Sequence, residues 1–252
     1  MSNIISQSST RIKTSLLLIF SLIIVGYIDS MLITWGLLGV LMIIAIKEAT
    51  DLFQICEGSI YLYAITTWIF AYFYPKPEDL IFVLGIIFAS ILAYTKKLNK
   101  DIFLPLMYPM ASFLALFSLY ISFGMSSLLW LLVIVAGTDI GAYFVGKSIG
   151  KTKFCITSPN KTIEGVIGGV ITASILGIYF IPSSIDFIIG IFIALIVSTA
   201  SIFGDLFESY LKREANVKDS GDLLPGHGGI LDRTDGYLFG GIIMLVLLRF
   251  VN

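Results

Sequence analysis

Long apolar stretches alternate with short polar turns along this chain of 252 residues. Each stretch is long enough to cross a hydrocarbon layer of about 30 Å as a helix, and a helix satisfies its own backbone hydrogen bonds in that layer. We therefore predict an all-α integral membrane protein with about nine transmembrane helices. The predicted spans are about 14–28, 31–46, 59–75, 80–95, 102–124, 127–145, 164–182, 185–207 and 236–251.

The composition supports this class. Hydrophobic residues make up 57% of the chain, charged residues 13%, and the mean hydropathy is +0.96, which is unusually apolar for a soluble domain. With a net charge of −1 and no evident basic surface, we expect no nucleic-acid partner. The two cysteines, Cys56 and Cys155, are too isolated to indicate a disulfide framework or a zinc site.

The basic residues predict the orientation, because they collect on the cytoplasmic side of a membrane protein. With a cytoplasmic N-terminus, all of them except Lys76 and Arg249 fall on the cytoplasmic side. We expect a multi-pass protein of a bacterial-type inner (plasma) membrane with two long cytoplasmic loops, about 146–163 and 208–235. Residues 1–125 then form a scaffold of about five spans, and residues 126–252 form the region that carries the chemistry.

Four aspartates lie near the predicted cytoplasmic ends of three spans: Asp139, Asp205, Asp232 and Asp235. An ionised carboxylate at membrane depth is costly unless a cation, water or a counter-charge meets it. For Asp232 or Asp235 alone, a helix cap is the simpler interpretation. The four together favour a divalent cation, and carboxylate oxygens suit Mg²⁺, which in turn binds phosphate.

Basic residues accompany these acids in both polar loops. Part of this charge reflects the positive-inside pattern and attraction to anionic lipid. Its interleaving with glycine, proline and acidic residues, however, favours a metal-bound polyphosphate. In "SPNKTIEG" (Ser158–Gly165), we predict that Ser158 is the N-cap of a helix with Pro159 at its first position, so that backbone N–H groups face a phosphate.

A second polar segment, "PGHGGILD" (Pro225–Asp232), is rich in glycine. Gly228 and Gly229 permit backbone angles closed to other residues and a close approach by a ligand. His227, the only histidine, either holds the loop or contacts a phosphate or ribose.

Four ordered blocks between residues 139 and 236 resemble the phosphatidate cytidylyltransferases, also called CDP-diacylglycerol synthases. "SYLKREANVKDSGDLLPGHGGILDRTD" (Ser209–Asp235) is similar to the signature of that family. The other blocks are "DIGAYFVGKSIGK" (Asp139–Lys151), "SPNKTIEG" (Ser158–Gly165) and "GDLFES" (Gly204–Ser209). Asn160 stands where the family often has a second lysine.

The resemblance implies an Mg²⁺-dependent nucleotidyltransferase that moves CMP from CTP to phosphatidic acid, giving CDP-diacylglycerol and pyrophosphate. It also implies a homodimer whose C-terminal helices form a polar funnel open to the cytoplasm. Asp205 and Asp232 would hold a paired-cation centre, with Asp139 as a further ligand, Asp235 close by and K⁺ as a candidate second cation.

The remaining site residues follow from the same blocks and from charge. The substrates would be bound by Ser158, Lys161, Thr162, Lys218, Asp219, His227, Gly228, Gly229 and Arg233. Lys212 and Arg213 would act with the aspartates on the departing pyrophosphate. The phosphatidate phosphate is already anionic, so its attack needs no strong general base.

Three other interpretations stay open at this point. A CTP-dependent kinase of polyprenol-type lipids, or another lipid cytidylyltransferase, would use similar groups. An ion-coupled transporter could use Asp139 and Asp205 as intramembrane ion sites, although such proteins often have repeated halves and broken helices near the midplane. A non-enzymatic lipid-binding scaffold would not need Asp232.

Overall fold

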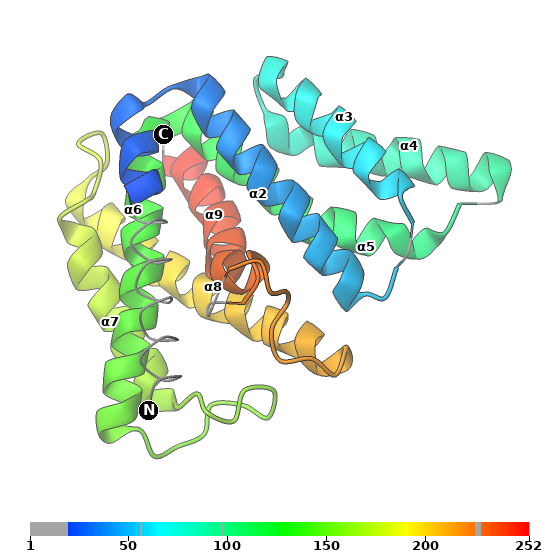
Figure 1. Cartoon of the computed structure of the whole chain (residues 1–252). Helices are drawn as coiled ribbons and strands as arrows, with labels where there is room; N and C mark the ends of the chain where they lie inside the picture. Colours follow the sequence, from blue (N-terminus) through cyan, green and yellow to red (C-terminus); the bar gives the residue numbers. More distant parts are fainter. Residues whose placement is uncertain (1–19, 56, 97, 225–227, 252) are drawn as a thin grey trace. The chain divides into compact units, whose positions relative to one another are not determined.

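The computed structural model of this protein describes residues 20–251, except 56, 97 and 225–227 (Figure 1). Within these ranges the regular elements are all helices, and the only β-type pairings are two isolated bridges, Lys153–Thr162 and Leu224–Gly228. The all-α prediction is therefore confirmed.

Residues 20–28 are helical, and the later elements follow the predicted apolar stretches. They are α2 (Met31–Leu52), α3 (Ser59–Phe73), η1 (Pro77–Asp79), α4 (Leu80–Thr95), η2 (Lys100–Ile102), α5 (Phe103–Pro105), η3 (Leu106–Met110), α6 (Ala111–Ile149), α7 (Ile163–Ile178), α8 (Phe187–Glu214) and α9 (Leu231–Val251).

Five helical segments among the described residues are long and apolar enough to cross a membrane: Met31–Leu52, Pro77–Thr95, Lys100–Ile149, Phe187–Glu214 and Leu231–Val251. The apolar helices α3 and α7 are shorter. The chain is thus a helical membrane protein, while the count of nine spans stays a prediction.

The segment Lys100–Ile149 contains the break that the sequence predicts between two spans. Gly124 has φ 74° and ψ −178°, a conformation open essentially to glycine alone. The Ser127 hydroxyl donates to the Gly124 carbonyl (2.7 Å) and lies 3.3 Å from the Leu119 carbonyl oxygen, which supports the break. The break predicted between the spans 102–124 and 127–145 is therefore present, although helix continues directly on both sides of it.

The chain divides into two compact units, one formed by residues 1–117 and 215–233, the other by 118–214 and 234–252. In the first unit, α2 and α3 pack through Trp35 and Trp68, whose rings stack. Each indole N–H donates to the backbone carbonyl of the other tryptophan, at 2.9 Å and 3.3 Å. Such reciprocal bonds satisfy two polar groups in apolar surroundings. Gly39 leaves the space that the Trp68 indole fills.

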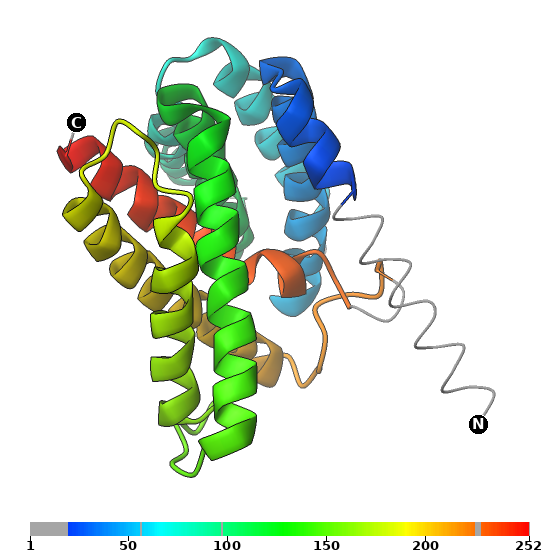
Figure 2. The ribbon, with the colours of Figure 1, turned by 90° about the vertical axis from the view of Figure 1, so that its left-hand side faces the viewer.

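In the second unit, α6 and α7 run side by side (Figures 1 and 2). A Cβ added at Gly169 of α7 would lie 2.7 Å from the Thr138 carbonyl oxygen of α6, and one at Gly141 would lie 2.9 Å from the Gly168 carbonyl oxygen. Small residues therefore allow the two backbones to approach closely, as in many membrane helix pairs. The Trp130 indole closes the contact by donating to the Gly177 carbonyl at 3.0 Å.

The same principle joins α8 to α9. A Cβ at Gly204 would overlap the backbone carbonyl of Asp235. Because Asp205 follows Gly204 directly, this approach brings Asp205 beside Asp235.

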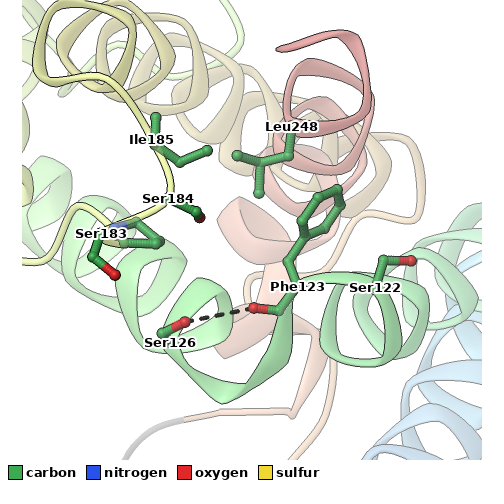
Figure 3. Close-up of a pocket in the computed structure, with 8 residues that line it drawn as sticks. Ser122, Phe123, Ser126, Ser183, Ser184, Ile185 and Leu248 are labelled. Carbon is green, nitrogen blue, oxygen red and sulfur yellow. Dashed lines mark hydrogen bonds between the residues drawn. The ribbon is translucent and has the colours of Figure 1, made fainter. Parts of the chain in front are cut away.

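A cavity of about 500 Å³ lies at the break in α6, within the second unit (Figure 3). Phe123, Ile185 and Leu248 surround it, and the Ser126 hydroxyl donates to the Phe123 carbonyl at 3.5 Å. Its other lining residues are Ser122, Pro182, Ser183 and Ser184, so no charged side chain of the described residues lines it. Leu248 also lies about 20 Å along α9 from Asp235. The cavity is therefore separate from Asp235.

The close contact at Gly39 predicts a stability difference between two glycines of the same helix. We expect Gly39→Ala to lower the free energy of unfolding by about 1–3 kcal/mol, because its methyl group overlaps the Trp68 ring. Gly36 is the matched control, since a Cβ there meets no atom within 4 Å. Gly36→Ala should leave stability unchanged or raise it by up to about 1 kcal/mol. Denaturant unfolding in detergent measures both, and equal stabilities would contradict the packing described.

Candidate active site

Three of the four predicted aspartates come together in the second unit. Asp139 lies on α6, Asp205 on α8 and Asp235 on α9. The carboxylates of Asp139 and Asp205 are close enough to Asp235 to act on it electrostatically, and so is the ammonium group of Lys212. Asp235 itself accepts the backbone N–H of Gly236 at 2.7 Å. The arrangement concentrates negative charge, which a bound cation would relieve.

Lys161 provides positive charge at this cluster. Its Nζ forms an ion pair with Oδ2 of Asp205, and both side chains stay partly exposed, at 25% and 34%. The Ser209 hydroxyl donates to the other oxygen, Oδ1, at 3.3 Å. A predicted substrate residue and a predicted metal ligand are thus direct neighbours.

The loop before α7 is held in shape by Glu164. Its carboxylate accepts the backbone N–H groups of Lys151 (3.1 Å) and Thr152 (3.2 Å) and the Thr152 hydroxyl (2.9 Å). Hydrogen bonds from its own backbone N–H, the Thr152 hydroxyl and the Lys151 N–H lower the pKa of Glu164 to about 2. Glu164, which lies outside the five long apolar segments, is therefore ionised at neutral pH and anchors the residues that carry Lys161.

The prediction that Ser158 begins a helix is wrong. α7 starts at Ile163, and Thr162 is its N-cap, with its hydroxyl accepting the Gly165 N–H at 3.1 Å. Ser158 instead lies in a turn, where its carbonyl accepts the Lys161 N–H at 3.0 Å. The bridge between Lys153 and Thr162 selects the later cap. The helix N-terminus therefore lies at residue 162, after Lys161.

Lys212 and Arg213 lie in the last turn of α8, and not in a loop as predicted from the sequence. The helix continues because Lys212 pairs with Glu208, one turn earlier, at 2.8 Å. The Glu208 side chain is fully buried, and that of Lys212 is 12% exposed. Glu208 was missed by the sequence analysis, although its spacing of four residues from Lys212 is a usable signal. Its carboxylate fixes where the Lys212 ammonium lies.

The first unit holds the glycine-rich loop, which we define as the described residues 215–224 and 228–230, and the first turn of α9. Oδ2 of Asp232 accepts the backbone N–H groups of Ser220 (2.8 Å) and Gly229 (2.8 Å), and the Ser220 hydroxyl oxygen lies 3.0 Å from it. Gly228 has φ +81°, and a Cβ there would lie 2.6 Å from Oδ2. This oxygen of Asp232 therefore ties the loop to α9.

A buried carboxylate from α2 reaches the same place. Glu48 is only 4% exposed, and Oε1 accepts Ile230 N at 2.9 Å. Oε2 accepts Leu231 N at 2.7 Å and the Ser220 hydroxyl at 2.9 Å. The sequence analysis missed Glu48 because the span predicted at 31–46 ended before it. The sequence did contain a feature that pointed to Glu48: an acidic residue at the end of an apolar stretch needs a partner for its charge.

The other predicted residues of the first unit lie nearby in sequence. Lys218, Asp219 and Arg233 are exposed, and Gly229 is buried against Glu48 and Ser220. His227 lies outside the described residues. The structure thus groups Lys161 and Lys212 with three aspartates in the second unit, and Asp219, Gly228 and Gly229 with Asp232 in the first.

The carboxylates that the structure brings together can be compared with the ligands expected of a magnesium site. Among the described residues, no three His, Cys, Asp or Glu side chains are close enough to form a ready-made metal site. The chemistry of the second unit's donors nevertheless suits a hard cation, because Asp139, Asp205 and Asp235 offer only oxygen ligands. Lys161 already occupies one side of Asp205 as a cationic partner. Magnesium therefore stays a prediction.

Comparison with known proteins adds a second line of evidence. The sequence model of the cytidylyltransferase family matches residues 9–251. A phosphatidate cytidylyltransferase of Helicobacter pylori (strain ATCC 700392 / 26695) is 40% identical over 249 residues, which is 98% of this chain and 94% of that protein. The protein of the same name from Bacillus subtilis (strain 168) is 48% identical over 121 residues, covering 46% of this chain and 45% of its own length.

The N-cap at Thr162 predicts a specific loss of stability. We expect Thr162→Val, which keeps the shape but removes the hydroxyl, to lower the free energy of unfolding by about 1 kcal/mol. Thr162→Ser retains the acceptor and should keep most of the stability. Denaturant unfolding, together with amide exchange at Gly165, measures the effect. An unchanged Gly165 exchange rate in Thr162→Val would show that the cap does not hold this turn.

Proposed function

Because this chain belongs to the cytidylyltransferase family, we propose that it acts as a phosphatidate cytidylyltransferase. It transfers CMP from CTP to phosphatidic acid and produces CDP-diacylglycerol and pyrophosphate, the step that supplies CDP-diacylglycerol for phospholipid synthesis. The observation that carries this proposal is the 40% identity over 98% of the chain to a relative of that name.

The chemistry of the reaction matches the groups of the second unit. A phosphatidate oxygen forms a bond to the α-phosphorus of CTP, and the bond between the α-phosphorus and the bridging oxygen to the β-phosphate breaks. The nucleophile carries its negative charge already, so the main obstacle is repulsion between two anions. Positive groups held at fixed positions reduce that repulsion. Lys161 and Lys212 are such groups, since Asp205 and Glu208 hold their ammonium ends.

Lys161 has a particular role in this proposal. An ammonium group has three N–H donors, and the ion pair with Asp205 leaves others for a phosphate oxygen. Its partial exposure gives a substrate access to it. The Asp205 carboxylate orients the Lys161 ammonium group through their ion pair.

We propose Asp139, Asp205 and Asp235 as the groups of the second unit that would hold Mg²⁺. When bound, the cation supplies charge neutralisation to the triphosphate. Asp232, which the family resemblance implies as a ligand beside Asp205, uses its Oδ2 to accept the Ser220 and Gly229 N–H groups. Its role as a ligand stays a prediction, and so does K⁺ as a second cation. Chelation of divalent ions should abolish turnover, and added Mg²⁺ should restore it.

The cellular setting follows from the distribution of charge. We propose an inner-membrane protein with its active site in a polar funnel on the cytoplasmic side, where all basic residues except Lys76 and Arg249 fall in the predicted topology. That is also the side where CTP is available. A homodimer, implied by the family resemblance, is part of the same proposal.

Asp205 provides the sharpest test by substitution. We expect Asp205→Asn to reduce kcat/KM by at least about 100-fold, because Lys161 loses its charged partner and the cluster loses a carboxylate. The assay measures pyrophosphate released by purified protein with CTP, phosphatidic acid and Mg²⁺ in detergent.

Asp186→Asn is the matched control, at the residue that directly precedes the same helix. Asp186 is exposed near the start of α8 and accepts the Ile188 N–H at 2.9 Å, a capping role that asparagine can also fill. Its activity should equal that of the wild type. Equal turnover by Asp205→Asn and the wild type would remove Asp205 from the site.

A further inference from the structure

Glu48 is a buried carboxylate that the proposed mechanism does not use. It lies in α2, one turn before the end of an apolar helix, and is 4% exposed. Burying a carboxylate without compensation is strongly unfavourable. The donors that reach it in the described structure are one hydroxyl and two backbone N–H groups, at 2.7–2.9 Å.

These donors share one location, the start of α9. Leu231 is the first residue of that helix and Ile230 precedes it. The first N–H groups of a helix have no acceptor within it, and the positive end of the helix dipole favours a carboxylate there. Glu48 therefore acts as an external cap, supplied by a residue 183 positions away from Leu231.

Ser220 links this cap to Asp232. Its hydroxyl lies 2.9 Å from Oε2 of Glu48 and 3.0 Å from Oδ2 of Asp232, while its backbone N–H donates to the same Asp232 oxygen at 2.8 Å. Glycine is required around this junction, since a Cβ at Gly221 would lie 2.9 Å from Oε1 of Glu48 and one at Gly229 would overlap Oε2. A shift of the Glu48 side chain would therefore displace Ser220, Gly229 and Asp232 together.

We propose that Glu48 is a positioning residue for the reaction: it fixes the glycine-rich loop and the first turn of α9, and through Ser220 it sets the position of the Asp232 carboxylate. This inference rests on the proposed function for its catalytic consequence. Its structural part, that Glu48 holds the loop, is independent of the reaction.

Glu48→Gln tests both parts with almost no change of shape. The side-chain amide nitrogen of glutamine is a donor, and it would replace an oxygen that accepts hydrogen bonds. At least one of the Ile230 N–H, the Leu231 N–H and the Ser220 hydroxyl therefore loses its acceptor. We expect faster amide exchange in peptides covering 218–224 and 228–233, with exchange in α3 and α7 unchanged. We also expect kcat/KM, normalised to the folded fraction, to fall about 10–100-fold, as when a supporting shell of an active site is removed.

Three further variants separate positioning from general stability. Asp51→Asn makes the same chemical change at an exposed site one turn later on α2 and should leave exchange and activity unchanged. Glu48→Asp keeps the charge and should recover part of the activity lost in Glu48→Gln. If Glu48→Gln fails to fold, Ser220→Ala removes only one hydroxyl and should still speed local exchange and lower kcat/KM.

The outcomes are distinct. Wild-type exchange in the loop of Glu48→Gln would overturn the inference, and so would faster exchange with undiminished activity. A wild-type enzyme that transfers no cytidylyl group would instead overturn the proposed function, while the exchange data would still show whether Glu48 holds the loop.

Discussion

The carboxylate of Glu48 is the contact on which the first unit's site depends. Backbone N–H groups at a helix start need acceptors, and where water is scarce the protein must supply them. Here the acceptor comes from α2, and it meets Ile230, Leu231 and Ser220 at once. Helix α2 of the predicted scaffold region and the residues Ser220, Ile230 and Leu231 are therefore parts of one hydrogen-bonded arrangement. The described part of the glycine-rich loop is held in place because the buried Glu48 carboxylate needs hydrogen-bond donors, and this loop and the start of α9 supply them.

The second unit obtains its site by a different constraint, close packing of helix backbones. Gly204 allows α8 to contact the Asp235 carbonyl directly, and this contact places the carboxylates of neighbouring turns near one another. The accumulated negative charge is then balanced by Lys161 and Lys212, each held by an acidic partner. The resulting mixture of fixed acids and bases suits a reaction between two phosphate anions, in which charge and position matter more than proton transfer.

Much of this could be predicted from the sequence, and the failures have physical causes. The apolar stretches predict the helices, and the turn at Gly124 is visible as a polar interruption. The start of α7 was misplaced because Ser158 and Thr162 are both good caps, and only the pairing of Thr162 with Lys153 distinguishes them. The end of α8 was misplaced because charged residues resemble a loop until the Glu208–Lys212 pair is seen. Glu48 could not be connected with Ser220, since no local pattern reports a contact over 172 residues.

The most direct test of the account follows two phosphorus labels through one reaction. Purified protein is incubated with phosphatidic acid and Mg²⁺, and with CTP labelled at either the α- or the γ-phosphate. The account predicts that the α label enters a chloroform-soluble lipid and that the γ label leaves as pyrophosphate. Transfer of the γ label to lipid, with the α label remaining on soluble CDP, would contradict cytidylyl transfer and identify a lipid kinase.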